Sequence, residues 1–188
     1  AHCVHVDSNE IGILADEGIG VVHCPASNMK LASGIAPIQK LQNEGVTIGL
    51  GTDGAASNND LDLFGEMRDA AMVGKLSAKS ASAVNATSVF SMATVGGANI
   101  LDIPAGRIEP GWVADLAVLD LEAAHLTPMR KCVNLLVYAA RGSDVIHTIC
   151  DGKVLMKDRE ILTLDESKVI ASARICANDL SERVRKKR

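Results

Sequence analysis

The feature that most constrains the fold is the stretch 46–59, where β-branched and aliphatic residues give way to Gly-Thr-Asp-Gly and small polar residues. This pattern predicts a buried strand that carries one carboxylate, Asp53, at its C-terminal tip. In barrels and open parallel sheets, such strand ends carry the chemistry. Aspartate also caps helices, so both a functional and a capping interpretation of Asp53 stay open at this point.

The segments before this stretch repeat an alternation of strand and helix. In chain order we expect a strand ending within 1–6, a helix begun by a capping box of Asp7 and Glu10, a strand at 19–24, a polar loop at 25–34, and a helix begun by Pro37. This order requires parallel pairing through right-handed crossovers, so all three strand tips point the same way. His2, the loop after Cys24 and Asp53 would then gather at one edge.

Helices and then a β-rich part are expected after Asp53. The first expected helix is capped by Asn58 or Asn59 and has Leu61, Phe64, Met67 and Ala71 on one face. The second begins at about Ser80, with Val84, Thr87 and Ala93 buried. The expected strands lie at 106–111, 114–119, 134–139, 145–150 and 153–156, with a hairpin turn at Asp151-Gly152 and a closing amphipathic helix at 165–185.

The predicted fold class is α/β, with three units. Residues 1–105 would form the C-terminal part of a (β/α)₈ barrel, 106–164 a small β-sandwich domain, and 165–188 a C-terminal helix. A complete barrel of this type needs roughly 250 residues, so the three strands would be at most its last three. The chain also begins Ala-His-Cys without a methionine, and we expect it to be a piece of something longer.

Composition excludes some classes of function. The net charge of −4 and an aromatic content of 2% argue against a nucleic-acid surface. The sequence shows neither a signal-peptide core nor an apolar run long enough to cross a bilayer. Its five cysteines lack C-x-x-C spacing and are expected to be reduced thiols. These features predict a soluble cytoplasmic protein.

His2 and Asp53 lie 51 positions apart, but the crossovers would bring their strand tips together. This pair suits metal-assisted hydrolysis, because the carboxylate can bind the ion and accept a proton from water while the imidazole stabilises the attacking hydroxide. A catalytic zinc normally has three protein ligands, so Asp53 cannot hold one alone. For His23, packing in the core is favoured over ligation.

The remaining candidate side chains are assigned structural roles. His5 is expected on an exposed turn, and His125 and His147 in the β-rich part are expected to be structural. Cys3 and Cys24 could be nucleophiles, but neither has a neighbouring cation that would lower its pKa. Buried thiols are the favoured interpretation.

Several segments resemble the amidohydrolase superfamily, specifically its branch of 5-methylthioadenosine and S-adenosylhomocysteine deaminases and related triazine hydrolases. Ala-His-Cys at 1–3, His-Cys-Pro-Ala-Ser-Asn-Met-Lys-Leu-Ala-Ser-Gly at 23–34 and Gly-Thr-Asp-Gly-Ala-Ala-Ser-Asn-Asn at 51–59 look like its last three strand ends. Ala-Thr-Val-Gly-Gly-Ala at 93–98 and Gly-Arg-Ile-Glu-Pro-Gly-Trp-Val-Ala-Asp-Leu at 106–116 match the segments that lead into its β-sandwich.

The resemblance implies hydrolytic deamination, in which hydroxide adds to C6 of an adenine ring and ammonia leaves. Asp53 would bind one divalent metal ion, zinc or alternatively iron, take the water proton and contact the nucleoside-like substrate. His2 would hydrogen-bond the hydroxide, and Ser27, Asn28 and Ser57 would line the substrate pocket. The other metal ligands and the glutamate that protonates the purine would belong to a missing N-terminal half of the barrel.

Alternatives to this function remain open. One is another amidohydrolase, such as a triazine chlorohydrolase or a guanine-type aminohydrolase. Another is a non-catalytic α/β module that keeps the fold without the metal, and a third is an unrelated doubly wound domain in which Asp53 only caps a helix. A homodimer is one possible form of the active protein.

Overall fold

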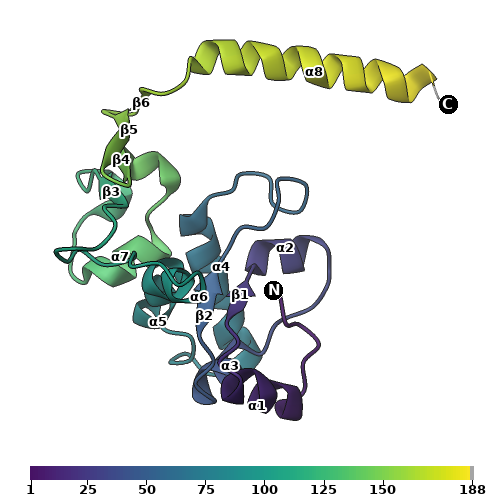
Figure 1. Ribbon diagram of the computed structural model, residues 1–188, viewed down its shortest axis with the longest axis vertical. Helices are drawn as coiled ribbons and strands as arrows, with labels where there is room; N and C mark the ends of the chain where they lie inside the picture. The colour runs from purple at the N-terminus through teal and green to yellow at the C-terminus, as the bar shows by residue number, and fades with distance from the viewer. Residues whose placement is uncertain (187–188) are drawn as a thin grey trace.

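Two short parallel strands form the centre of the first half of the chain. In the computed structural model, which describes residues 1–186, β1 (Val21–His23) pairs with β2 (Ile48–Leu50), with Val21 opposite Ile48 (Figure 1). Both lie within the predicted segments but are shorter. The strand expected within 1–6 is wrong: one backbone bond, His2 N–H to Val22 O at 2.9 Å, joins this segment to β1. His2 and Cys3 have positive φ angles, which break the extended conformation.

Helices pack around this strand pair. They include α1 (Ser8–Asp16), α2 (Pro25–Lys30), α3 (Ile38–Asn43) and α4 (Leu63–Ala78). The capping box of Asp7 and Glu10 at α1 is confirmed. The polar loop expected at 25–34 is wrong in its first part, because Pro25 takes the first position of α2, where its fixed φ favours a helix and its missing N–H costs nothing.

The long helix α4 begins later than predicted. Its N-cap is Asp62, whose Oδ1 accepts a hydrogen bond from Phe64 N–H at 2.9 Å, so the predicted caps at Asn58 or Asn59 are wrong. Leu61 consequently lies outside the helix and is 49% exposed. Met67 and Ala71 are buried, as the helical spacing predicted.

A nearly continuous helical segment packs against β2. It consists of α5 (Ala86–Ser91), the π-helical turn η1 (Met92–Gly96) and α6 (Gly97–Ile100). The predicted start at Ser80 is wrong, because Asn85 provides the N-cap by accepting Ser88 N–H. Val84 is buried in the preceding loop, whereas Thr87 is exposed.

The core lies between these helices and the two strands. Its larger buried members are Ile11, Val21, Ile38, Leu41, Ile48, Met67, Val84, Val89, Met92 and Val137. Because several helices contribute to this one core together with β1 and β2, the strand ends are held at fixed positions. The loops that follow β1 and β2 are anchored on that core.

The second half of the chain contains an antiparallel sheet in the order β3-β4-β5-β6. Its strands are β3 (Leu116–Leu119), β4 (Val145–Cys150), β5 (Lys153–Lys157) and β6 (Glu160–Ile161). The hairpin at Asp151-Gly152 is confirmed, and both residues have positive φ, as this turn requires. No strand forms at 106–111, contrary to expectation.

The strand expected at 134–139 is also wrong, because this segment is helix α7 (Cys132–Tyr138). Val137 is fully buried, and α7 packs on α4 and α5. Arg68 of α4 donates to the carbonyl oxygens of Tyr138 and Ala140 at 3.1 and 2.8 Å. These bonds satisfy carbonyl groups at the end of α7 and hold it in place.

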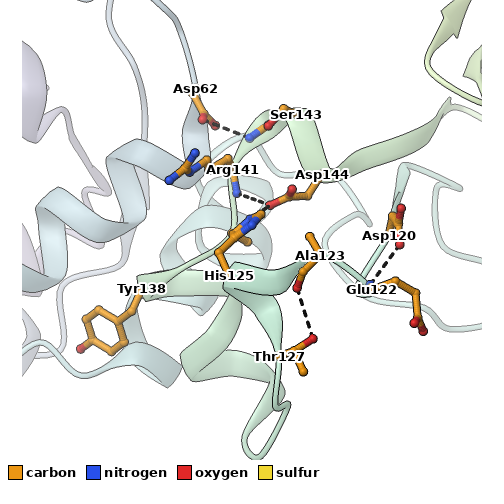
Figure 2. Close-up of polar contacts among 12 residues, drawn as sticks. Asp62, Asp120, Glu122, Ala123, His125, Thr127, Tyr138, Arg141, Ser143 and Asp144 are labelled. Atoms are coloured by element: carbon orange, nitrogen blue, oxygen red, sulfur yellow. Dashed lines mark hydrogen bonds and ion pairs between the residues drawn. The ribbon is translucent and has the colours of Figure 1, made fainter.

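Short helical turns connect α7 to the sheet. They are η2 (Ala124–Leu126) and η3 (Gly142–Asp144). The nearly buried Asp144 contacts His125 Nε2 at 3.0 Å and accepts Arg141 N–H at 2.9 Å (Figure 2). Asp62 also accepts Gly142 N–H at 3.1 Å, which ties the start of α4 to η3. His125 therefore has the structural environment that the sequence indicated.

The chain continues into helix α8 (Glu166–Lys186), which lies apart from the body of the molecule (Figure 1). The closing helix predicted at 165–185 is confirmed. None of its residues is buried. No helix within residues 1–186 is long and apolar enough to cross a membrane. The predicted division at residues 105 and 164, and the β-sandwich, stay predictions.

Candidate functional site

His2 and Asp53 come together beyond the ends of the two parallel strands. Asp53 follows β2, and the separation between its Oδ2 and His2 Nε2 is 3.8 Å. Both residues have φ angles in the left-handed region, 65° and 62°. Non-glycine residues in that region often occur at functional sites, where the surrounding structure holds them. The predicted convergence of these side chains is present.

Ser27, at the start of α2, holds the carboxylate of Asp53. The Ser27 hydroxyl donates to Asp53 Oδ2 at 2.7 Å, and Gly54 N–H donates to Oδ1 at 2.7 Å. These bonds favour the ionised form, with Ser27 the larger cause, and they lower the pKa of Asp53 to about 2. Asp53 is therefore a carboxylate at neutral pH.

Asn28, also on α2, orients the His2 ring. Its Oδ1 lies 2.9 Å from His2 Nδ1. Because an amide oxygen only accepts, Nδ1 donates, and in the neutral ring Nε2 is left unprotonated on the side facing Asp53. Asn28 is buried, and its Nδ2 has no hydrogen-bond partner in the described structure. That amide nitrogen is thus a buried donor whose hydrogen bonds are not made.

Ser57 lies in the loop that follows Asp53. Its hydroxyl donates to Gly54 O at 3.2 Å, which closes a turn at residues 54–57. Ser57 thus supports the backbone whose N–H contacts Asp53. The structure brings the predicted residues His2, Asn28 and Asp53 together, Ser27 contacts Asp53, and Ser57 lies in the adjoining loop.

His23 and Cys24, at the end of β1, are both buried. Burial is the main cause that lowers the pKa of His23 to about 4, and the nearby His2 adds to it, so His23 is neutral. Its Nδ1 has no hydrogen-bond partner in the described structure. Burial also raises the pKa of Cys24, which keeps it a thiol. A neutral, buried His23 does not suit a general acid at neutral pH, and a protonated Cys24 thiol does not suit a nucleophile.

Glu66 on α4 was missed by the sequence reasoning. It is only 2% exposed, accepts Ala26 N–H at 3.2 Å, and accepts a hydrogen bond from Asn58 Nδ2. Burial is the main cause that raises its pKa to about 7. Helical spacing could have revealed it, since Glu66 shares the buried face of α4 with Ala70 and Gly74.

Lys30 makes a second contact between α2 and the loop, at the surface. Its Nζ donates to Ala56 O at 2.8 Å and to Asn59 Oδ1 at 2.6 Å. The loop after Asp53 is therefore attached to α2 by Glu66 in the interior and by Lys30 at the protein surface. No pattern in the sequence pairs Lys30 with this loop.

A separate cavity of about 520 Å³ lies between α4, α5 and β3. Its lining is mainly apolar and includes Phe64, Met67, Phe90, Leu116 and Leu136. None of the predicted site residues lines it. Few of the side chains that line this cavity could activate water.

Residues 1–186 contain no group of three or more His, Cys, Asp or Glu side chains that could hold a metal ion. Asp53 fits one position in such a site, because it is ionised and its side chain is 35% exposed. Hard carboxylate oxygens suit divalent ions, and zinc also accepts them. The described part of the chain thus offers one strong ligand.

An ionised aspartate after β2, with a histidine 3.8 Å from it, is an arrangement that suits hydrolytic chemistry in an α/β protein. A family model described as "Amidohydrolase family" matches residues 1–155, and the chain belongs to this family. A 5-methylthioadenosine/S-adenosylhomocysteine deaminase from Haloarcula marismortui is 61% identical over 183 residues, which cover 97% of this chain and 42% of the relative.

Solved structures of related enzymes have the same fold. An adenosine deaminase from Xanthomonas campestris with bound zinc superposes with a TM-score of 0.94 at 39% identity, over 96% of this chain and 42% of that one. An atrazine chlorohydrolase from Arthrobacter aurescens, complexed with zinc, gives a TM-score of 0.85 at 27% identity, over 93% of this chain and 39% of that one.

The chain thus spans about two fifths of the length of the relatives it matches. The mixed α/β structure and this partial coverage confirm the predicted fold class, the C-terminal part of an amidohydrolase barrel. The resemblance stated from the sequence is confirmed by the same matches.

Proposed function

We propose that the protein containing this chain is a metal-dependent hydrolytic deaminase that acts on an adenosine derivative, 5-methylthioadenosine or S-adenosylhomocysteine, and releases ammonia. The observation that carries the proposal is the 3.8 Å approach of His2 to the ionised Asp53. The 61% identity to a relative of that name supports the choice of substrate. A hydrolytic site needs such a base beside a group that can hold the attacking water.

Asp53 would be one ligand of a divalent ion, zinc by analogy with the Xanthomonas structure or alternatively iron. When bound, the ion supplies Lewis-acid activation of water at neutral pH. The low pKa of Asp53 favours this role, because a ligand must be deprotonated. The remaining ligands would come from the N-terminal half of the barrel, which is therefore this chain's principal partner.

The side chains of this chain would divide the proton chemistry. Asp53 accepts the proton of the attacking water and passes it toward the leaving ammonia. His2 uses Nε2 to orient the attacking oxygen, since Asn28 engages its other nitrogen. Asn28 and Ser57 line the substrate pocket, and Asp53 also contacts the substrate. Each predicted site residue thus has a role in the proposed reaction.

The proposal extends to the state of the protein in the cell. All five cysteines are free thiols. This is consistent with a cytoplasmic protein, which we expect. A homodimer is part of the proposal, and a measurement of the molecular mass of the full-length protein in solution tests it.

The experiment compares the full-length protein, its Asp53→Asn variant and the isolated 188-residue chain with zinc and 5-methylthioadenosine or S-adenosylhomocysteine. We expect ammonia release from the full-length protein alone, and loss of bound zinc in Asp53→Asn. Asp60→Asn is the matched control, because Asp60 is an exposed aspartate in the same loop. Rapid ammonia release by the isolated chain would contradict the role given to the missing half.

A triazine hydrolase is the second candidate function, because the atrazine chlorohydrolase structure also superposes closely. Chloride release from atrazine that exceeds ammonia release from either adenosine derivative would favour it over the deaminase. A guanine-type aminohydrolase would instead release ammonia from guanine. A protein without stoichiometric metal, indifferent to Asp53→Asn, would be a non-catalytic module.

A further inference from the structure

Glu66 is a buried carboxylate at the junction of the two segments that form the site. One segment is α2, which supplies Ser27 and Asn28, and the other is the loop 54–61 after Asp53. Glu66 belongs to neither, since it comes from the first turn of α4. It is 2% exposed, and a carboxylate is buried at a cost unless its hydrogen bonds are made. Its partners therefore matter.

Each carboxylate oxygen of Glu66 accepts a hydrogen bond, one from α2 and the other from the loop 54–61. Oε2 accepts Ala26 N–H at 3.2 Å, next to Ser27, and Oε1 accepts Asn58 Nδ2. The N-cap residue of α2, Cys24, makes no side-chain cap bond, so Glu66 satisfies a helix N–H from outside. Asn58 is buried as well, and its Oδ1 accepts Leu61 N–H at 3.0 Å.

These contacts determine where Ser27 and Asp53 meet. The bond from Ala26 N–H to Glu66 holds the backbone next to Ser27, whose hydroxyl is 2.7 Å from Asp53 Oδ2. The bond from Asn58 to Glu66 holds the end of the turn that begins at Gly54. A carboxylate has two acceptor oxygens, so Glu66 can accept from both donors at once. Asp69, one helical turn further along α4, makes neither contact.

We propose that Glu66 is a positioning residue that holds α2 and the loop 54–61 together so that Ser27 keeps Asp53 in its working orientation. The inference rests on the proposed function for its catalytic readout. Glu66 does not touch the reacting atoms and acts through Ala26 and Asn58. Groups that hydrogen-bond a metal ligand, as Ser27 does here, typically contribute about 10- to 100-fold in activity or metal affinity, and Glu66 acts through the position of Ser27.

The test uses Glu66→Gln in the full-length protein. The amide keeps the size but presents one acceptor and one donor, so in either orientation its nitrogen faces a second donor, Ala26 N–H or Asn58 Nδ2. We expect kcat to fall about 10- to 100-fold, with a smaller change in KM. The matched control Asp69→Asn makes the same chemical change on the same helix and should leave kcat within about twofold of the parent value.

A second variant reverses the direction of one hydrogen bond. In Glu66→Gln combined with Asn58→Asp, the new amide donates to the new carboxylate and still accepts Ala26 N–H, and the carboxylate still accepts Leu61 N–H. We expect this double variant to regain most of the lost kcat, whereas Asn58→Asp alone, which sets two carboxylates together, should be impaired. Parent-like kcat in Glu66→Gln, or no recovery in the double variant, would overturn the proposal.

Amide hydrogen exchange gives a readout that does not depend on turnover. In Glu66→Gln, exchange should accelerate at least tenfold in residues 26–28 and 54–61, and the double variant should restore protection. If the parent protein fails to release ammonia while this exchange pattern appears, the deaminase assignment fails and the positioning role stands. If the parent is active and exchange in both segments is unchanged, the positioning role fails.

Discussion

Gly96, the last residue of the π-helical turn η1, is packed directly against β2. A Cβ atom at this position would lie 2.2 Å from the carbonyl oxygen of Ile48 and 3.0 Å from that of Ser91. Both are backbone atoms, and Ile48 is held by its pairing with Val21 of β1. Gly96→Ala therefore requires the helix and the strand to move apart.

The expected cost follows from this overlap. Overpacking in a well-packed core costs about 1–3 kcal/mol when side chains can adjust, and here the backbone itself must shift. The higher helix propensity of alanine, worth roughly 0.5–1 kcal/mol, offsets only part of this cost. We therefore expect Gly96→Ala to lower the free energy of unfolding by about 1–3 kcal/mol.

Gly97 provides the matched control, because it is the next residue of the same helical segment. A Cβ there would find its nearest neighbour, Met92 O, at 4.0 Å, which is an ordinary contact. Gly97→Ala should thus be neutral or slightly stabilising. The assay is thermal and urea unfolding of the full-length parent and both variants under identical conditions. Equal Tm values for the two variants, or a larger loss in Gly97→Ala, would refute the reasoning.

Three further predictions concern single side chains. Ser27→Ala should raise the pKa of Asp53 toward its ordinary value, since the Ser27 hydroxyl is the main cause of its lowering. An NMR titration of the Asp53 carboxyl carbon in the metal-free protein measures this pKa, and an unchanged value would argue against the contact. Burial raises the pKa of Glu66 from 4.5 to about 7, so proton binding stabilises the fold fully below about pH 4.5 and this contribution is lost as pH rises to 7. The stability of Glu66→Gln relative to the parent should therefore increase over that range in urea unfolding, and a constant difference would contradict the shift. Asp62→Ala removes the N-cap of α4 and the bond to Gly142 N–H, and should cost about 0.5–2 kcal/mol in the same assay, where an unchanged midpoint would count against it.

Part of the site could be predicted because its signals are local or topological. The glycine-flanked Asp53 follows a strand in the sequence, and alternating strands and helices imply parallel pairing with tips at one edge. His2 and Asp53 accordingly meet, although His2 belongs to no strand. The contact from Asn28 to His2 and that from Ser27 to Asp53 depend on α2, which was expected to be a loop.

The sequence by itself determined the elements whose hydrogen bonds close within a few residues. The capping box of Asp7 and Glu10 and the turn at Asp151-Gly152 formed as predicted, because each satisfies its own backbone groups locally. The family resemblance, carried by short contiguous motifs, was equally readable.

Only the tertiary structure decided the elements that depend on distant partners. Residues 134–139 have a composition that suits a strand, yet they form a helix because Val137 is buried against α4 and α5 and Arg68 binds the carbonyl groups at its end. Glu66 acquired its two donors from segments 40 and 8 positions away. Burial and hydrogen-bond partners of this kind are properties of the packed chain, since local preference is weaker than the free energy of filling a core.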